Sequence, residues 1–253
     1  MLDVERLEEG LREQTAGFAR AAGGGDPQAI VPTCPEWPLR VLVGHIGQAH
    51  RWTAELLRKG EPPLSVPDPW QAEPGAPETW EEWLRAGAED LIGALRETGA
   101  DKEMWTFLGP RPGVFWLRRM LADTAIHHYD VAATTGAAFG IAGDLAADVI
   151  TEGMEMLVAP GAVQLKPELV ELRGQGERLG LRPRSGDGWV LTRAPEGLRW
   201  EPGPVPADVD VVVSGAVADL MLVCSRRLPL DAGRVEVTGD RALMDHWLAR
   251  MAF

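Results

Sequence analysis

Cysteine is almost absent from this chain of 253 residues, which contains only Cys34 and Cys224. The two lie far apart and form no Cys-x-x-Cys pattern, so the sequence predicts neither a disulfide framework nor a thiol-redox centre, as is typical of a reducing cytosol. No segment approaches the roughly 18 uninterrupted apolar residues that cross a bilayer. The N-terminal residues MLDVERLEEGLREQ also lack the apolar stretch of a secretion signal. We therefore expect an intracellular, cytoplasmic protein.

Positive charge is scarce as well. The chain has 25 Lys and Arg against 38 Asp and Glu, which gives a formal net charge of -13 at pH 7. Since no basic cluster stands out, we expect no binding to nucleic acid or to an anionic membrane surface. The expected partner is a small molecule, and the protein itself is expected to be a monomer or a homodimer.

Tyrosine occurs once, whereas tryptophan occurs ten times. Most of these indoles are expected in the core or at helix contacts, and the alternative is that some of them line a ligand pocket. The tryptophans of the first half are Trp37, Trp52, Trp70, Trp80, Trp83, Trp105 and Trp116.

The first part of the chain shows apolar residues at helical spacing. A Pro-rich segment at 61–77 requires a long connection between the second and third helices. The predicted helices cover residues 4–22, about 38–58, 80–95, about 114–134 and 145–158.

Beyond about residue 165 the apolar period changes to that of strands. Pro160 and Pro167 lie at this change. The length favours two domains, which we place at residues 1–162 and 163–253, the second of them α+β. Its predicted strands cover 177–184, 189–193, 197–200, 208–215 and 234–239, with helices at about 216–226 and after Asp240.

Asp123 and His127 are the most informative pair in the sequence. Residues i and i+4 of a helix are about 40° apart around its axis, which suits two ligands of one metal ion. His45 is the best third ligand, because it lies on the apolar stripe of the second predicted helix. The alternatives are an exposed helical ion pair for Asp123 and His127, and a hydrogen-bonded core histidine for His45.

Three further residues accompany these ligands. Asp130 is placed to accept a hydrogen bond from a ligand imidazole, or else it is a solvated or helix-fixing carboxylate. His128 lies about 100° from His127 around the helix and should face elsewhere. His50 also diverges from the face of His45, so neither histidine is expected to coordinate.

The segment Val31-Pro32-Thr33-Cys34-Pro35-Glu36-Trp37 precedes His45, and Asp123, His127 and Asp130 follow on a later predicted helix. These segments resemble the mycothiol-dependent maleylpyruvate isomerase family, whose members carry Pro-x-Cys-Pro-Gly-Trp before a ligand histidine and then Glu-x-x-x-His-x-x-Asp. The C-terminal match consists of SGAVADLMLVCSRRLP and RVEVTGDRALMDHWLARMAF. The resemblance implies α plus α+β architecture, with a DinB-like antiparallel four-helix bundle followed by a small sterol-carrier-like α+β domain.

Two departures from the family pattern concern the site. Asp123 replaces Glu, so its carboxylate is one methylene shorter and must draw the helix or the metal closer by about an ångström. Glu36 replaces Gly, and its side chain either points to solvent or narrows the mouth of the site.

The resemblance also implies the chemistry. His45, Asp123 and His127 would bind zinc or another divalent metal, and the same ligand set also suits iron. Mycothiol would serve as thiol cofactor or co-substrate, and its metal-bound thiolate would attack a small electrophile, as in an isomerase or an S-transferase. Arg226 would supply a catalytic and cofactor-binding guanidinium, against the alternative of a surface arginine at a helix C-terminus.

The rival interpretation belongs to another class of protein. The second domain and the Trp-rich bundle would then hold a small hydrophobic ligand without catalysis, and the metal would be structural or absent. Asp123 in place of Glu is the feature that favours this alternative.

Overall fold

A computed structural model describes residues 2–62 and 65–251. Positions 63–64 of the predicted Pro-rich loop and positions 252–253 of the predicted second domain lie outside the described residues. The chain forms two compact units, Met1–Ile141 and Ala142–Phe253. Within the described ranges, none of the helices combines the length and the apolar character that a bilayer crossing requires.

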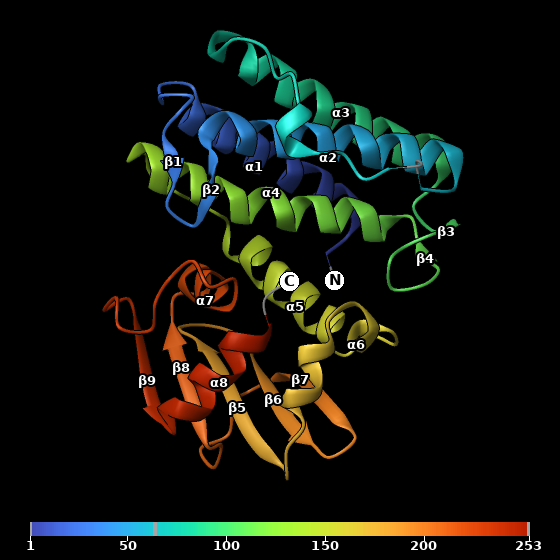
Figure 1. The fold of residues 1–253 in the computed structure, drawn as a ribbon. Helices are drawn as coiled ribbons and strands as arrows, with labels where there is room; N and C mark the ends of the chain where they lie inside the picture. The colour runs from blue at the N-terminus through green and yellow to red at the C-terminus, as the bar shows by residue number, and fades with distance from the viewer. Residues whose placement is uncertain (1, 63–64, 252–253) are drawn as a thin grey trace. The chain divides into compact units, whose positions relative to one another are not determined.

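The first unit is built on long helices that lie side by side (Figure 1). They are α1 (Val4–Ala22), α2 (Leu39–Lys59), α3 (Trp80–Thr98) and α4 (Val114–Thr135). Both α1 and α2 pack against α3 and α4, so the apolar stripes of all four meet in one core. Gly60 (φ 80°) ends α2 and Gly136 (φ 75°) ends α4 in left-handed conformations that glycine adopts without strain. These observations confirm the predicted helices and the predicted bundle.

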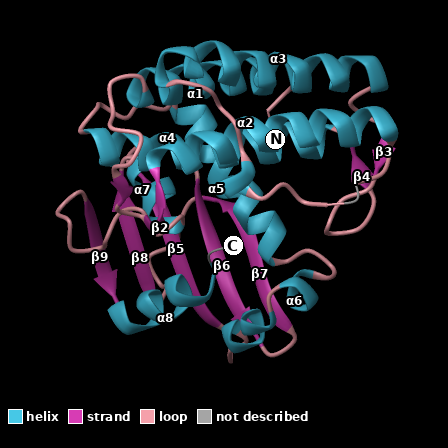
Figure 2. Ribbon diagram, turned by 45° about the horizontal axis from the view of Figure 1, so that its top comes forward, coloured by secondary structure: helices cyan, strands magenta, loops and turns pink. Residues whose placement is uncertain are grey.

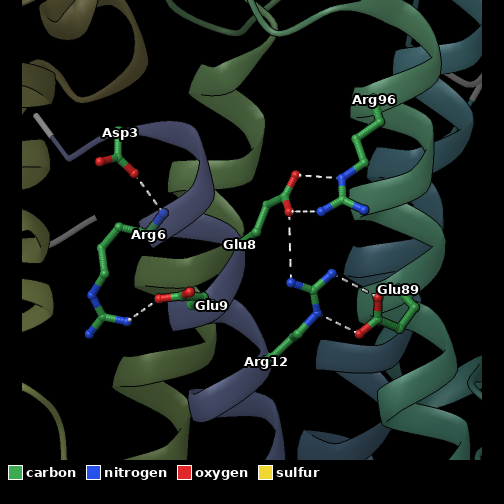
Figure 3. A network of polar contacts seen from close by, with 7 residues as sticks. All are labelled: Asp3, Arg6, Glu8, Glu9, Arg12, Glu89 and Arg96. Carbon is green, nitrogen blue, oxygen red and sulfur yellow. Dashed lines mark hydrogen bonds and ion pairs between the residues drawn. The ribbon is translucent and has the colours of Figure 1, made fainter.

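A polar network joins α1 to α3 (Figure 3). Glu8 is only 3% exposed, and its carboxylate accepts hydrogen bonds from the Arg96 guanidinium, one of them at 2.9 Å. Arg12 binds Glu89 through two parallel hydrogen bonds of 2.7 and 3.0 Å. Because a buried carboxylate is costly without a cationic partner, this network fixes the register of α1 on α3.

Close approach of α2 and α3 depends on Gly47. A Cβ atom at this position would lie 1.9 Å from the Trp83 ring, so a larger residue would push α3 away. The Arg51 guanidinium lies 4.3 Å from the Trp83 ring centroid and donates to the Trp83 carbonyl at 2.7 Å. The Trp83 indole therefore lies against α2, between Gly47 and the Arg51 guanidinium.

Two short hairpins interrupt the helices, and neither was predicted from the sequence. The first pairs β1 (Ile30–Val31) with β2 (Cys34–Pro38), and the second pairs β3 (Glu103–Met104) with β4 (Arg111–Pro112). Strands this short carry no period of apolar residues. The first hairpin leads directly into α2, where Pro38 is the residue before the helix and not its first residue as predicted. Single 3-10 turns, η1 (Pro69–Gln71) and η2 (Pro77–Thr79), follow in the long connection to α3.

The second unit contains a five-stranded sheet, counted within the described residues (Figure 2). Its strand order is β7-β6-β5-β8-β9, with β5 and β8 parallel and all other neighbours antiparallel. The strands are β5 (Glu177–Pro183), β6 (Gly188–Ala194), β7 (Gly197–Gly203), β8 (Val211–Gly215) and β9 (Val235–Gly239). The helical segments are α5 (Gly143–Leu157), α6 (Ala162–Leu165), η3 (Pro167–Leu172), α7 (Val217–Cys224) and α8 (Arg241–Met251). The predicted α+β class is confirmed.

Helix α5 lies in the second unit, although the sequence placed it in the first domain. It packs against α7, and the Trp189 indole of β6 donates to the Thr151 hydroxyl of α5 at 3.0 Å. The division therefore falls after Ile141, well before the boundary predicted at residue 162. The periodicity of apolar residues distinguishes a helix from a strand, but it does not show which other elements a helix packs against.

Limited proteolysis should locate the boundary at which the units fold independently. Ala137 and Ala138 are exposed and lie between α4 and α5, so elastase, which cleaves after small residues, should cut there first. We expect a protected fragment that begins at residue 138 or 139 and retains α5, identified by mass spectrometry of timed digests. Accumulation of a protected fragment ending at 158–165 would instead support the boundary predicted from the sequence.

Candidate metal centre

The structure brings His45, Asp123 and His127 together. Nε2 of His45 lies 3.3 Å from Oδ2 of Asp123, and Nε2 of His127 lies 3.9 Å from Oδ1 of the same carboxylate. One ligand atom from each residue lies within 4.8 Å of the other two. The two imidazole rings face each other edge-on, with centroids 5.1 Å apart. Helix α4 thus carries Asp123 and His127 on one face, as their i, i+4 spacing predicted, and α2 carries His45, the third candidate ligand.

These separations suit a small divalent ion. Ligand atoms about 2.0–2.1 Å from a tetrahedral zinc ion lie roughly 3.3 Å apart, close to the observed His45 to Asp123 distance. The shorter carboxylate of Asp123 therefore still reaches His45. Two imidazoles and one carboxylate also leave a coordination position for another molecule, as in catalytic zinc sites.

Asp130 orients His127. Its Oδ2 lies 2.8 Å from Nδ1 of His127, and its Oδ1 accepts a hydrogen bond of 2.6 Å from the Thr33 hydroxyl. Asp130 is fully buried, so its charge requires these donors. In the neutral ring, a proton donated from Nδ1 of His127 to Asp130 leaves the lone pair on Nε2, the nitrogen nearer Asp123. Of the two roles considered for Asp130, the structure shows the hydrogen bond to the imidazole.

The β1–β2 hairpin delivers further side chains that the sequence did not place. Trp37 stacks obliquely on His45, with ring centroids 5.1 Å apart. Cys34 lies within 4.8 Å of His127 and Asp130 and could form a second ligand group with them. That group is less suitable, because His127 and Asp130 already bond to each other. Glu36 on the same hairpin is exposed.

The carboxylate of Asp123 is held in its charged form. Burial by itself would raise the pKa of Asp123, but its hydrogen bond with His45 and its electrostatic interactions with the neighbouring imidazoles and with Arg119 lower it below its ordinary value. A charged carboxylate at neutral pH is the form that binds a cation.

His50 and His128 point away from the centre, as predicted. Nε2 of His50 lies 2.9 Å from the Thr124 hydroxyl, which donates to the Met120 carbonyl at 2.7 Å. The hydroxyl must therefore accept from Nε2 of His50, and Nδ1 has no hydrogen-bond partner within the described residues. His128 bonds Gln14 at 2.9 Å. Burial lowers the pKa of each histidine to about 4.

Arg226 follows α7 in the second unit. It is exposed, and its backbone N–H donates to the Val223 carbonyl at 2.9 Å. Its φ of 59° lies in the left-handed region. The binding role of Arg226 stays a prediction.

Comparison with known proteins agrees with this architecture. Residues 9–132 match the profile of the "Mycothiol maleylpyruvate isomerase N-terminal domain", and residues 144–246 match the "MDMPI C-terminal domain". No curated protein sequence matches the chain significantly. The crystal structure of a mycothiol-dependent maleylpyruvate isomerase is similar in fold, with a TM-score of 0.61, 19% identity and coverage of 94% of this chain and 93% of that one. A histidine-to-alanine mutant of a mycothiol-dependent maleylpyruvate isomerase gives the same TM-score and coverage at 18% identity.

Removing the partner of His127 should weaken metal binding. Asp130→Ala leaves the Nδ1 proton of His127 without its acceptor, and we expect zinc affinity to fall roughly 10- to 100-fold, as is typical for such partners. Competition with a chromogenic chelator measures this affinity. The control is Asp219→Ala, which removes a carboxylate paired with Arg234 in the second unit. Equal affinities for Asp130→Ala and the parent protein would contradict the orienting role.

Acidification should destabilise the metal-free protein through His50. The folded-state pKa of about 4 lies below the ordinary value of 6.5, so the unfolded state takes up the proton first as the pH falls. The stability associated with neutral His50 is complete above pH 6.5 and is lost toward pH 4, with roughly 2 kcal/mol gone at pH 5. Urea unfolding with chelator present should show a shallower pH dependence for His50→Gln and an unchanged one for the control His246→Gln. Parallel pH profiles for His50→Gln and the parent would refute the assignment.

Proposed function

The chain belongs to the mycothiol maleylpyruvate isomerase family, and on this premise we propose that it is a metal-dependent enzyme that uses mycothiol to isomerise or conjugate a small electrophile. The observation that carries the proposal is the convergence of His45, Asp123 and His127 within 4.8 Å. The buried hydrogen bond between His127 and Asp130 supports it, because a proton held on Nδ1 of a neutral imidazole places the lone pair on Nε2, the coordinating nitrogen.

His45, Asp123 and His127 hold one divalent ion, for which zinc is the best match to the ligand set. When bound, such an ion supplies the positive charge that favours the thiolate form of a thiol near neutral pH. Asp130 keeps the proton of His127 on Nδ1, and Thr33 keeps Asp130 in place. Trp37 contacts the His45 ring at a tilt of 48° and places an apolar surface beside this ligand.

We assign the role of nucleophile to the thiol substrate. Cys224 is buried, and burial raises the pKa of its thiol to about 12, so it stays protonated. In an isomerase the thiol adds across a carbon–carbon double bond, the resulting single bond rotates, and expulsion of the same thiol restores the double bond. In a transferase the sulfur–carbon bond persists.

Arg226 is the residue that we assign to an anionic group of the thiol or of the electrophile. A guanidinium binds a carboxylate through two parallel hydrogen bonds. The exposed position of Arg226 leaves its side chain accessible to such a group.

The proposal is tested by separating metal content from turnover. His45→Ala and His127→Ala should lose most of their zinc yet stay folded, because truncation of a ligand leaves the apolar core intact. Asp123→Glu should bind zinc at least as well as the parent, whereas Asp123→Ala should not. Arg226→Ala should keep its zinc while its requirement for mycothiol rises. Elemental analysis, circular dichroism and mycothiol-dependent turnover are the measurements.

His246→Ala is the matched control, since its half-exposed imidazole lies in the second unit. Full zinc occupancy and full thiol-dependent turnover in all three alanine variants of the ligands would contradict the proposed centre. A folded, zinc-free parent protein that binds apolar dyes would support the non-enzymatic binder instead.

A further inference from the structure

A cavity of about 530 Å³ adjoins the candidate metal centre, and His45 and Asp123 form part of its wall. This volume is typical of pockets for small organic ligands. Aromatic rings make up much of the remaining lining, namely those of Trp37, Trp52, Trp105, Phe107 and Trp116. The second and fourth helices and the loops on either side of them supply these side chains.

The indoles present ring surface and few hydrogen-bond donors to this cavity. Nε1 of Trp52 donates to the Ser65 carbonyl at 3.0 Å, and Nε1 of Trp116 donates to the Trp105 carbonyl at 2.8 Å. The Trp105 and Trp116 rings are stacked at an angle of 18° with centroids 6.1 Å apart. Because these polar groups are already paired, the rings offer apolar contact to a ligand.

Other polar groups of the wall are also engaged. With its amide oriented to satisfy both neighbours, Gln48 donates to the Asp68 carbonyl (3.3 Å) and accepts from the Ala72 N–H (3.2 Å). The Thr53 hydroxyl is the exception, since it is buried and has no hydrogen-bond partner within the described residues. The charged groups of the wall are Arg119 and the proposed metal ligand Asp123, and the rest of the lining returns few hydrogen bonds to a ligand rich in hydroxyl groups.

Large apolar side chains remain exposed on the same lining. Trp105 is 41% exposed and Val66 is 80% exposed. Exposed apolar surface that is continuous with a cavity is typical of a ligand-binding site. An apolar ligand in the cavity would remove part of this surface from water.

We propose that this pocket, in the enzyme proposed above, binds the apolar, ring-bearing body of an electrophilic substrate, such as an aryl enone, with its reactive carbon toward His45 and Asp123. Addition of a thiol to an aryl enone forms one sulfur–carbon bond at the β carbon. The π electron pair of the double bond takes up the thiol proton at the α carbon. The addition therefore needs no oxidant and releases no leaving group.

Binding is tested with a saturated ketone that cannot react. Benzylacetone should bind the zinc-loaded full-length protein roughly 10- to 100-fold more tightly than methyl propyl ketone, which has a methyl group in place of the phenyl ring. Trp105→Ala should weaken benzylacetone roughly three- to tenfold. Trp70→Ala should have no effect, because Trp70 is similarly exposed (50%) but is not part of the pocket lining. Isothermal titration calorimetry measures these affinities.

Turnover is tested with the corresponding enones. Mycothiol consumption with benzylideneacetone should exceed that with ethylideneacetone by a similar factor in kcat/KM, and Trp105→Ala should reduce this preference. Equal binding of the two ketones, or an unchanged affinity for benzylacetone in Trp105→Ala, would overturn the pocket assignment even if thiol-dependent turnover is present. Selective ketone binding without any thiol consumption would support the pocket and count against the proposed enzyme.

Discussion

The hydrogen bond between His127 and Asp130 is the contact on which the site depends. It connects two residues one turn apart on α4, and the Thr33 hydroxyl connects the same carboxylate to the β1–β2 hairpin. A fully buried carboxylate must have such partners. These contacts of Asp130 therefore hold the β1–β2 hairpin against α4 and favour the proton on Nδ1 of His127. Because the hairpin leads directly into α2, they also help to position the start of that helix. The aromatic cover of His45 follows from these contacts, because Trp37 lies on the same hairpin.

Most of the helices and strands could be predicted from the sequence, because the periodicity of apolar residues differs between the two kinds of element. The helices carrying His45, Asp123 and His127 begin and end within a residue or two of their predicted bounds. The i, i+4 spacing placed Asp123 and His127 on one face. The contact between α2 and α4 joins residues far apart in the sequence. The choice of His45 as third ligand therefore relied on its place on an apolar helix stripe and on the family resemblance.

Other features depend on contacts that leave no period in the sequence. The hairpins are held by a few backbone hydrogen bonds, and α5 is assigned to the second unit by its packing on α7 and β6. The composition showed that tryptophan is abundant, but it did not show which tryptophans line the cavity. Their pairing with the Ser65 and Trp105 carbonyls decides which surfaces face a ligand, and these acceptors belong to the backbone.

The backbone of Arg226 has a consequence for how this chain can change. Arg226 is the non-glycine residue with positive φ (59°) among those described, in a region where a side chain costs roughly 1–2 kcal/mol. Replacing Arg226 by glycine would relieve that cost just after α7 but would remove the guanidinium. At this position, a gain in backbone stability therefore comes with the loss of a side chain that can bind anions. Selection for heat resistance alone would tend to erase the arginine. Retention of an arginine at position 226 in thermostable relatives would therefore indicate that its side chain has a function.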